Sequence, residues 1–502
     1  MIYENMLIGL TNALQFTSLL SVVVGTALGL FIGAMPGLSA TMGIALLLPI
    51  TYSMGPASGI SMLCALYMGA MYGGSISAIL IKTPGTPAAA ATVLDGYPMA
   101  QQGKAGKALG VSLIASLIGG VLSSIALLTI APILGNFALQ FGPVELAAVA
   151  VLGITIIGSL SQGSALLGLL SGIIGLLLSL VGMDPITGTP RFVFGNINLF
   201  SGLPYTVALI GLFSIPQAIR LIEKDGEVAK VVSSIKDRML PTWEEFKLIL
   251  PTILRSSAIG IVTGIIPGTG GDTACWFGYN EAKRFSKNKE KFGKGCIEGV
   301  AAAEAANNAV VGGALIPTIT LGIPGSSATA IIMGGLMIHG IMPGPTLMTE
   351  YADVTYTLIW ALMFSNVAMF ILGMLFTRAA INVTKISNKV LGPIIIILCV
   401  IGSFAINNSM FDVYLMFAFG ILGYFMDKIK MPTSPMVVGL ILGKMLDVSL
   451  HQSLLMSQGS WLVFLKNPIS AVLITIAFLS ILQATPLFGF IKRKIKDNKA
   501  KA

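Results

Sequence analysis

Long stretches of this chain contain no charged residue. None of Asp, Glu, Lys or Arg occurs in residues 5–81 or 108–143, and after Glu145 the next charge is Asp184. A helix needs ~20 mainly apolar residues to cross a hydrocarbon layer of ~30 Å. Charged residues make up 10% of the 502 residues, whereas a soluble domain carries about 25%. We therefore expect an all-α polytopic membrane protein with roughly 10 to 14 membrane elements, several of them interrupted by Gly and Pro.

The net charge of +9 is confined to short segments between apolar runs. Basic residues gather in residues 224–247, in residues 283–294 and in the tail at 492–501. This is the positive-inside pattern, which indicates that these loops are cytoplasmic and that the partner of the basic residues is the lipid bilayer. We expect no nucleic-acid partner.

The four cysteines and two histidines lie far apart in the sequence and form no pair with metal-ligand spacing. They exclude the usual zinc and iron–sulfur patterns. We predict no cofactor, and the one metal considered is a sodium ion acting as coupling ion. No Walker A pattern is present, which fits a secondary transporter and not an enzyme that hydrolyses ATP.

Two similar pairs of motifs occur in the same order in each half of the chain. The first half has Gly33-Ala-Met-Pro-Gly and a second motif that begins at Gly73-Gly-Ser and ends at Pro84-Gly-Thr86. Gly264-Ile-Ile-Pro-Gly and Gly312-Gly-Ala, running to Pro324-Gly-Ser326, follow at offsets of 231 and 240 between the matching prolines. The charges that flank matching motifs reverse between the halves, which predicts two inverted-topology repeats. The predicted units are 1–222 (first membrane repeat), 223–246 (cytoplasmic linker), 247–387 (second membrane repeat) and 388–502 (additional peripheral helices with a basic cytoplasmic tail).

Each Pro-Gly pair should interrupt its helix, because Pro removes a backbone donor and Gly relaxes the dihedral angles. The helix N-terminus after such a break exposes N–H groups suited to a carboxylate. The alternative is a packing kink with ordinary helix caps. The residues predicted to bind substrate are those at and after the breaks: Gly37, Ser39, Thr41, Gly85, Thr86, Gly268, Thr269, Gly325, Ser326 and Ser327.

Three further polar residues are candidates for the coupling ion. A carboxylate at membrane depth is costly and usually functional, which singles out Asp272. Asn307 and Asn308 could offer amide oxygens to a sodium ion. The alternatives stay open: Asp272 as a helix cap, and the two asparagines as hydrogen-bond partners of a neighbouring helix.

Several long motifs resemble the large membrane subunit of the tripartite tricarboxylate transporter family. They are residues 33–49, residues 72–110 with Lys82-Thr-Pro-Gly-Thr-Pro87 and Asp95-Gly-Tyr-Pro-Met-Ala100, and residues 303–345. The resemblance implies a multi-pass protein of the bacterial inner membrane. It works with a small four-helix membrane subunit and a periplasmic solute-binding protein. The implied activity is symport of citrate, another tricarboxylate or a related organic carboxylate, driven by a sodium or proton gradient. Related carboxylate transporters also imply re-entrant hairpins and an elevator-type mechanism.

Two other functions compete with the transporter. One is a passive channel. The other is an intramembrane aspartyl protease using Asp272 and Asp412, although Thr269 and Phe411 stand where that class carries Gly and Tyr. For a transporter, the uncharged or acidic loops at 54–59 and 348–353 are the predicted docking sites of the binding protein.

Overall fold

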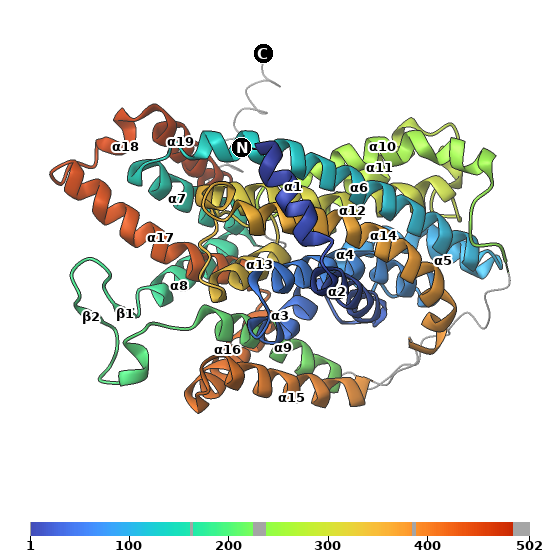
Figure 1. The fold of residues 1–502 in the computed structure, drawn as a ribbon. Coiled ribbons are helices and arrows are strands. Elements are labelled where there is room, and N and C mark those ends of the chain that lie inside the picture. Colours follow the sequence, from blue (N-terminus) through green and yellow to red (C-terminus); the bar gives the residue numbers. More distant parts are fainter. Residues whose placement is uncertain (1, 161–163, 224–236, 384–387, 485–502) are drawn as a thin grey trace, which may run out of the picture.

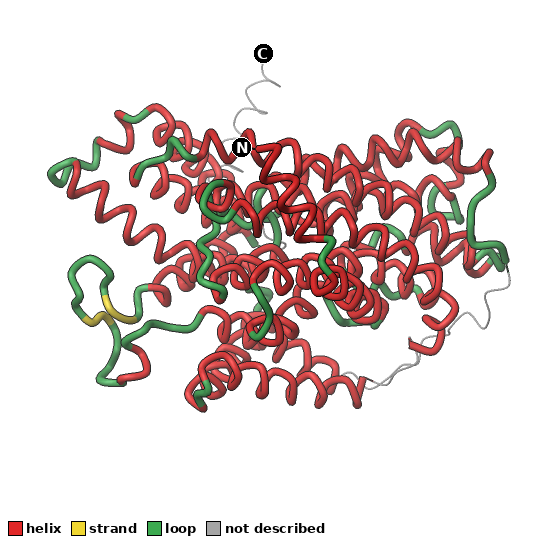
Figure 2. The backbone as a smooth tube through the Cα atoms, viewed as in Figure 1, coloured by secondary structure: helices red, strands yellow, loops and turns green. Residues whose placement is uncertain are grey.

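The computed structural model describes residues 2–160, 164–223, 237–383 and 388–484, and in these ranges the chain is nearly all helical (Figures 1 and 2). The helices are α1 (Ile2–Ala13), α2 (Phe16–Ala34), α3 (Ala40–Tyr52), α4 (Pro56–Ile81), α5 (Val93–Gln101), α6 (Ala105–Ala138), α7 (Pro143–Leu160), α8 (Ala165–Ser179), α9 (Tyr205–Glu223), α10 (Trp243–Ile265), α11 (Gly270–Phe285), α12 (Ile297–Leu321), α13 (Ser327–Ile338), α14 (Ala352–Val383), α15 (Asn388–Asn407), α16 (Met410–Lys428), α17 (Ser434–Met456), α18 (Val463–Lys466) and α19 (Pro468–Ala484).

Short elements join these helices. They are the 3-10 turns η1 (Pro87–Ala89), η2 (Ile197–Leu199), η3 (Lys289–Lys291) and η4 (Pro345–Met348), and the strands β1 (Gly182–Met183) and β2 (Pro190–Arg191). The two strands pair antiparallel in the loop between α8 and α9. This small hairpin is the departure from an all-helical fold.

Nine helices of the described residues are long and apolar enough to cross a membrane, and five shorter apolar helices accompany them. The chain is thus a multi-pass membrane protein, as its charge-free stretches predicted. Where the structure describes them, the charge-free stretches at 5–81 and 108–143 are mostly helical. Of the predicted linker at 223–246, residues 224–236 lie outside the described residues, and α10 already begins at Trp243.

The centre of the molecule is formed by α4 and α12, whose membrane-length windows are completely buried. Helix α2 packs along α4, and α10 and α6 pack along α12. Figure 1 shows α4, α12 and α13 near the middle of the molecule, with α15 and α16 along one edge and α17 leading outward. In the last unit, α15 and α16 pack on α9, while α17 contacts α7 and α8.

Glycine lets the paired helices approach closely, because lipid supplies no hydrophobic drive for helix association. A Cβ atom on Gly29 of α2 would lie 2.3 Å from the carbonyl oxygen of Leu66 on α4. A Cβ on Gly260 of α10 would lie 2.3 Å from the carbonyl oxygen of Ala306 on α12. Gly260 lies 231 residues after Gly29, and Ala306 lies 240 residues after Leu66, which are the two offsets between the matching Pro-Gly motifs.

The breaks themselves repeat this correspondence. A Cβ on Gly85 would lie 1.8 Å from the carbonyl oxygen of Gly33, and one on Gly325 would lie 2.7 Å from that of Gly264. In each half, the glycine after the second proline therefore packs against the end of the helix that precedes the first proline.

Candidate functional site

The four Pro-Gly pairs of the repeated motifs all interrupt helices. They lie between α2 and α3, between α4 and η1, between α10 and α11, and between α12 and α13. Gly37 and Gly268 adopt φ angles of 87° and 81°, in the left-handed region that favours glycine. The last two breaks contact each other directly, because the backbone N–H of Gly268 donates to the carbonyl oxygen of Gly325 at 3.0 Å.

A cavity of about 430 Å³ opens beside this contact. Five of the predicted site residues line it, and they come from the last two breaks: Gly268, Thr269, Asp272, Ser326 and Ser327. Pro87, which follows Thr86 in the second break, also lines it. The structure therefore brings three of the four breaks to one place.

Ser326 has two roles in this wall of the cavity. It is the N-cap of α13, where its Oγ accepts the backbone N–H of Thr329 at 3.3 Å and Thr329 Oγ1 accepts the N–H of Ser326 at 2.9 Å. Its hydroxyl also lies 3.2 Å from the Tyr67 hydroxyl of α4. The next residue, Ser327, shares a hydrogen bond with Ser434 at the start of α17, at 2.6 Å between the two Oγ atoms.

The opposite wall was missed by sequence reasoning. It consists of residues from the end of α16 to the first turns of α17: Asp427, Lys430, Met431, Pro432, Thr433, Ser434 and Val438. Lys430 is the one cationic side chain among the residues lining the cavity, and Asp427 is paired with Arg220 at 2.9 Å. The available signal was Met431-Pro-Thr-Ser-Pro435, two hydroxyls between two prolines that separate two apolar runs.

The first break lies elsewhere. A Cβ on Gly37 would meet Gln217 and Leu221 of α9, each at 3.3 Å. Ser39 is the N-cap of α3, and its Oγ accepts the N–H of Met42 at 3.1 Å. Thr41 is half-buried in the first turn of α3. None of the three predicted residues of this break lines the 430 Å³ cavity.

In the second break, Gly85 and Thr86 are buried against α4. The N–H of Gly85 donates to the carbonyl oxygen of Gly74 at 3.1 Å. Thr86 is 2% exposed, and within the described part of the chain its Oγ1 has no hydrogen-bond partner. A buried hydroxyl without a partner is unusual in a folded protein, and Thr86 does not line the 430 Å³ cavity.

Asn307 and Asn308 are fully buried on α12. Asn307 Nδ2 donates to the carbonyl oxygen of Met71 at 3.3 Å, and Asn308 Nδ2 lies 3.3 Å from the sulfur of Met68. The Oδ1 atoms of both asparagines lack partners among the described residues. A Cβ on Gly271 would lie 3.0 Å from Asn307 Oδ1. This oxygen therefore lies next to the start of α11, where Gly271 directly precedes Asp272.

Asp95, part of the Asp-Gly-Tyr-Pro-Met-Ala motif, joins the two halves. Its Oδ1 accepts the backbone N–H groups of Gly293, Gly295 and Cys296 at 2.8–2.9 Å, just before α12 begins. Its Oδ2 accepts the hydroxyl of Tyr279 at 2.8 Å. Asp95 is fully buried and every one of these partners is a donor. This arrangement suits an ionised carboxylate at a helix N-terminus.

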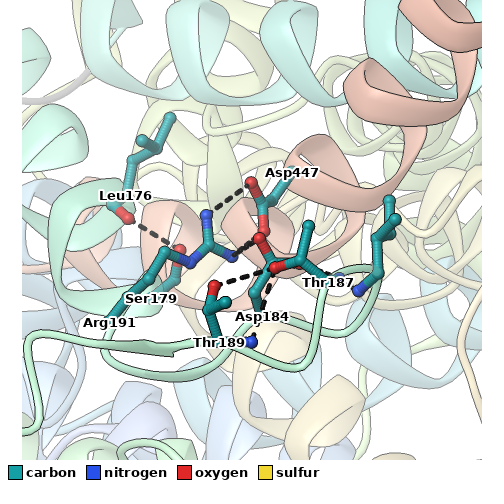
Figure 3. Close-up of polar contacts among 8 residues, drawn as sticks. Leu176, Ser179, Asp184, Thr187, Thr189, Arg191 and Asp447 are labelled. Atoms are coloured by element: carbon teal, nitrogen blue, oxygen red, sulfur yellow. Dashed lines mark hydrogen bonds and ion pairs between the residues drawn. The ribbon is translucent and has the colours of Figure 1, made fainter.

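A second cavity, of about 330 Å³, lies beside the β1–β2 hairpin. Figure 3 shows Arg191 between Asp184 and Asp447, the latter on α17. Arg191 Nη1 donates to Asp447 Oδ1 at 3.2 Å, and Arg191 Nη2 lies 3.7 Å from Asp184 Oδ2. The backbone N–H of Ile186, at 2.8 Å, is the main cause that lowers the pKa of Asp184. These contacts fix the hairpin against α17.

Membrane-length apolar helices and a polar cavity between interrupted helices are together typical of a membrane transport protein. Residues 19–438 match the model of the tripartite tricarboxylate transporter TctA family. The chain belongs to this family, and the resemblance seen in its motifs is confirmed. The competing protease has no support in the cavity, since Asp272 lines it and Asp412 does not.

Two relatives come from Agrobacterium vitis. The chain is 35% identical over 473 residues to an uncharacterized 52.8 kDa protein in the TAR-I ttuC' 3' region, which covers 94% of each chain. It is also 35% identical over 225 residues to an uncharacterized protein in the TAR-II ttuC' 3' region, covering 45% of this chain and 93% of that protein. No solved structure matches the chain.

Proposed function

We propose that this chain is the large transmembrane permease subunit of a binding-protein-dependent secondary transporter. It imports tricarboxylates or related organic carboxylates, and a sodium or proton gradient drives the import. The proposal rests above all on the 430 Å³ cavity at the third and fourth breaks.

The cavity has the groups that a carboxylate requires. The N-termini of α11 and α13 begin at it and carry partial positive charge. Side-chain hydroxyls of Thr269, Ser326 and Ser327 line it from the breaks, and Lys430 lines it from the other wall. A substrate with two or more carboxylates could engage the helix ends with one group and Lys430 with another.

We propose further that the two halves are inverted repeats and that the mechanism is of the elevator type. The shared offsets of the Gly29–Leu66 and Gly260–Ala306 contacts support the repeat. The reversed flanking charges support the inversion. Together, α2 with α3 and α10 with α11 then form the re-entrant hairpins.

An elevator mechanism requires the two walls of the cavity to move past each other. Ser327 lines the cavity from the fourth break and Ser434 from the start of α17, and their Oγ atoms are 2.6 Å apart. Replacing both with Cys should allow a disulfide, which needs Cβ atoms within about 3.5–4.5 Å. Oxidation should then stop uptake and dithiothreitol should restore it. Full uptake by the cross-linked protein would exclude relative motion of these walls.

Asp272, Asn307 and Asn308 are the proposed residues of the coupling ion. The unpartnered Oδ1 atoms of the two asparagines support this role, because amide oxygens are acceptable ligands of a hard cation such as sodium. Asp272 lines the cavity, so an ion held beside it would interact electrostatically with a bound substrate.

The partners follow from the family and from the loops. We propose a small four-helix membrane subunit and a periplasmic solute-binding protein, in the bacterial inner membrane. The basic segment at 283–294 marks the cytoplasmic side. The loops at 54–59 and 348–353 are the proposed docking sites on the opposite side.

The test is uptake in proteoliposomes that contain the chain, its small partner and its binding protein. Radiolabelled citrate should accumulate above its outside concentration when a sodium or proton gradient is imposed. Equilibration without accumulation under either gradient would identify a passive channel instead. Exchange of external label against internal unlabelled citrate, with no gradient, tests the binding site by itself.

A further inference from the structure

Glu304 is a carboxylate buried at the centre of the molecule. It lies on α12, in a window that is completely buried, and none of its own surface is exposed. Its Oε1 accepts the hydroxyl of Thr92, and its Oε2 accepts the hydroxyl of Ser116 on α6 at 3.4 Å. Among the ion pairs of the described residues, none involves Glu304. Burying an ionised carboxylate without a cation costs a great deal of free energy, so neutralisation is favoured.

The contrast with Asp95 shows what is special about Glu304. Three of the four partners of Asp95 are backbone N–H groups, which can only donate. Most partners of Glu304 are hydroxyls, those of Thr92, Ser112 and Ser116, which donate to a carboxylate but can rotate and accept from a carboxylic acid, and the amide of Asn307 is a further donor. Glu304 can therefore hold a proton toward one of these hydroxyls while its other oxygen still accepts hydrogen bonds.

Glu304 is linked to the candidate substrate site through a short segment. Thr92 follows η1, whose first residue, Pro87, lines the 430 Å³ cavity. Asn307 lies one turn further along α12 with a free Oδ1, next to Gly271 at the start of α11. A change in the protonation of Glu304 reverses the hydrogen bond to Thr92. That bond holds the segment between Pro87 and Thr92 against α12.

Other titratable groups on the elements packed against α12 have their own environments. Tyr67 bonds to Ser326, and Asp95 accepts the backbone N–H of Cys296 just before α12. Lys107 pairs with Glu245, and Arg255 lies over the ring of Phe285. Asp272 lines the cavity, and the Cys275 thiol interacts weakly with Glu304.

We propose that Glu304 carries the coupling proton of this transporter. This rests on the proposed function, takes the proton in place of a sodium ion at Asp272, Asn307 and Asn308 as the coupling ion, and names the residue that carries it. Glu304 lines neither of the two cavities described above and its oxygens contact their hydroxyl partners directly, so a proton fits where a sodium ion with its ligand shell would need extra room. Substrate would bind with Glu304 neutral, and release of the proton to the cytoplasm would reset the carrier.

The experiment compares wild type with Glu304→Gln, a permanently neutral mimic, in proteoliposomes. For wild type we expect citrate accumulation driven by a pH gradient without sodium, and alkalinisation of a weakly buffered outside medium during uptake. Glu304→Gln should lose gradient-driven accumulation by at least about tenfold and keep citrate exchange within about twofold, because exchange needs no change of protonation. Glu304→Asp should recover part of the accumulation.

The matched control is Glu298→Gln on the same helix, where Glu298 Oε2 accepts the hydroxyl of Ser286 at 2.8 Å. It should accumulate citrate like the wild type. Accumulation by Glu304→Gln at the wild-type level would overturn the proposal. So would wild-type uptake that needs a sodium gradient and moves no protons, a result that does not depend on how any variant folds. Absence of exchange in wild type, with citrate and with a panel of other di- and tricarboxylates, would instead refute the proposed function itself.

Discussion

Replacing Ser326 with Ala separates the two roles of this residue. Ser326 lines the cavity, and its Oγ lies 3.2 Å from the Tyr67 hydroxyl and also caps α13. A hydrogen bond to a charged group is worth about 1.5–3 kcal/mol, and 1.4 kcal/mol is tenfold in affinity. If Ser326 binds a substrate carboxylate, Ser326→Ala should raise the apparent KM for citrate roughly 10- to 100-fold. Loss of the cap should lower stability by about 0.5–2 kcal/mol.

Ser39→Ala is the matched control for the cap. Ser39 caps α3 through the same type of bond, from the N–H of Met42 to Oγ at 3.1 Å, but it does not line the cavity. It should lower the melting temperature in detergent much as Ser326→Ala does and leave the KM for citrate unchanged. Initial uptake rates over a range of citrate concentrations, normalised to protein in the membrane, give the KM of each variant.

Two results would refute this reasoning. An unchanged KM in Ser326→Ala would mean that the hydroxyl serves α13 alone. An equal rise of KM in both variants would mean that loosening any of these caps disturbs the site indirectly. Binding of citrate to the separate periplasmic protein should be the same throughout, which checks that the effect resides in this chain.

Three further predictions concern the breaks, the joint between the halves and the hairpin. Gly85→Val should prevent stable folding, because even its Cβ would lie 1.8 Å from a carbonyl oxygen of α2. In the control Gly55→Ala the added Cβ meets nothing within 4 Å. On size exclusion, Gly55→Ala should elute like the wild type and Gly85→Val should not. Tyr279→Phe removes one hydrogen bond and should cost about 0.5–1.5 kcal/mol of stability. Asp95→Asn should cost more, since it also disturbs three backbone hydrogen bonds. Equal melting temperatures of the two variants would contradict this. Because the pKa of Asp184 is lowered in the folded protein, its contribution to hairpin stability is complete above the ordinary pKa of 3.8 and is lost as the pH falls through the lower folded pKa. Pepsin should therefore cut the hairpin faster at about pH 2 than at about pH 4, with both rates taken relative to an unfolded peptide. Asp184→Asn should abolish that difference.

The sequence predicted the membrane helices because charge is excluded from lipid over long, unbroken stretches. It predicted less about α4, which holds several Ser, and about α12, which holds Thr, Asn and Glu. The membrane-length windows of both are completely buried, so their surroundings are other helices and not lipid. Hydropathy measures the preference of a segment for the lipid hydrocarbon, and it therefore predicts the outer helices better than the central ones.

The candidate site could be predicted only in part. The third and fourth breaks were found because Pro-Gly disrupts a helix wherever it stands. The opposite wall, with Lys430, was missed because no local pattern says which distant segment closes a cavity. Likewise, Tyr67 meets Ser326 across 259 positions of sequence, and only the packing of α4 against α13 brings them together.

Matching motifs also differ in their surroundings, which sequence comparison alone does not reveal. Thr86 and Ser326 follow equivalent Pro-Gly pairs, yet Thr86 is buried without a partner while Ser326 caps a helix beside the cavity. The proposed inverted repeats would account for this difference if one copy of the motif faces the open cavity while the other is packed away.

Close packing and ligand binding are therefore not competing explanations of the Pro-Gly breaks. The missing side chain of Gly325 lets its backbone lie against Ala314, where a Cβ would be 2.6 Å from the Cα of that residue. That approach brings the carbonyl oxygen of Gly325 within 3.0 Å of the Gly268 N–H and so ties two broken helices together. The next residue, Ser326, then starts α13 at the wall of the cavity. The glycine holds the unwound backbone in place, and for that reason the polar residue proposed to bind substrate begins its helix at the cavity.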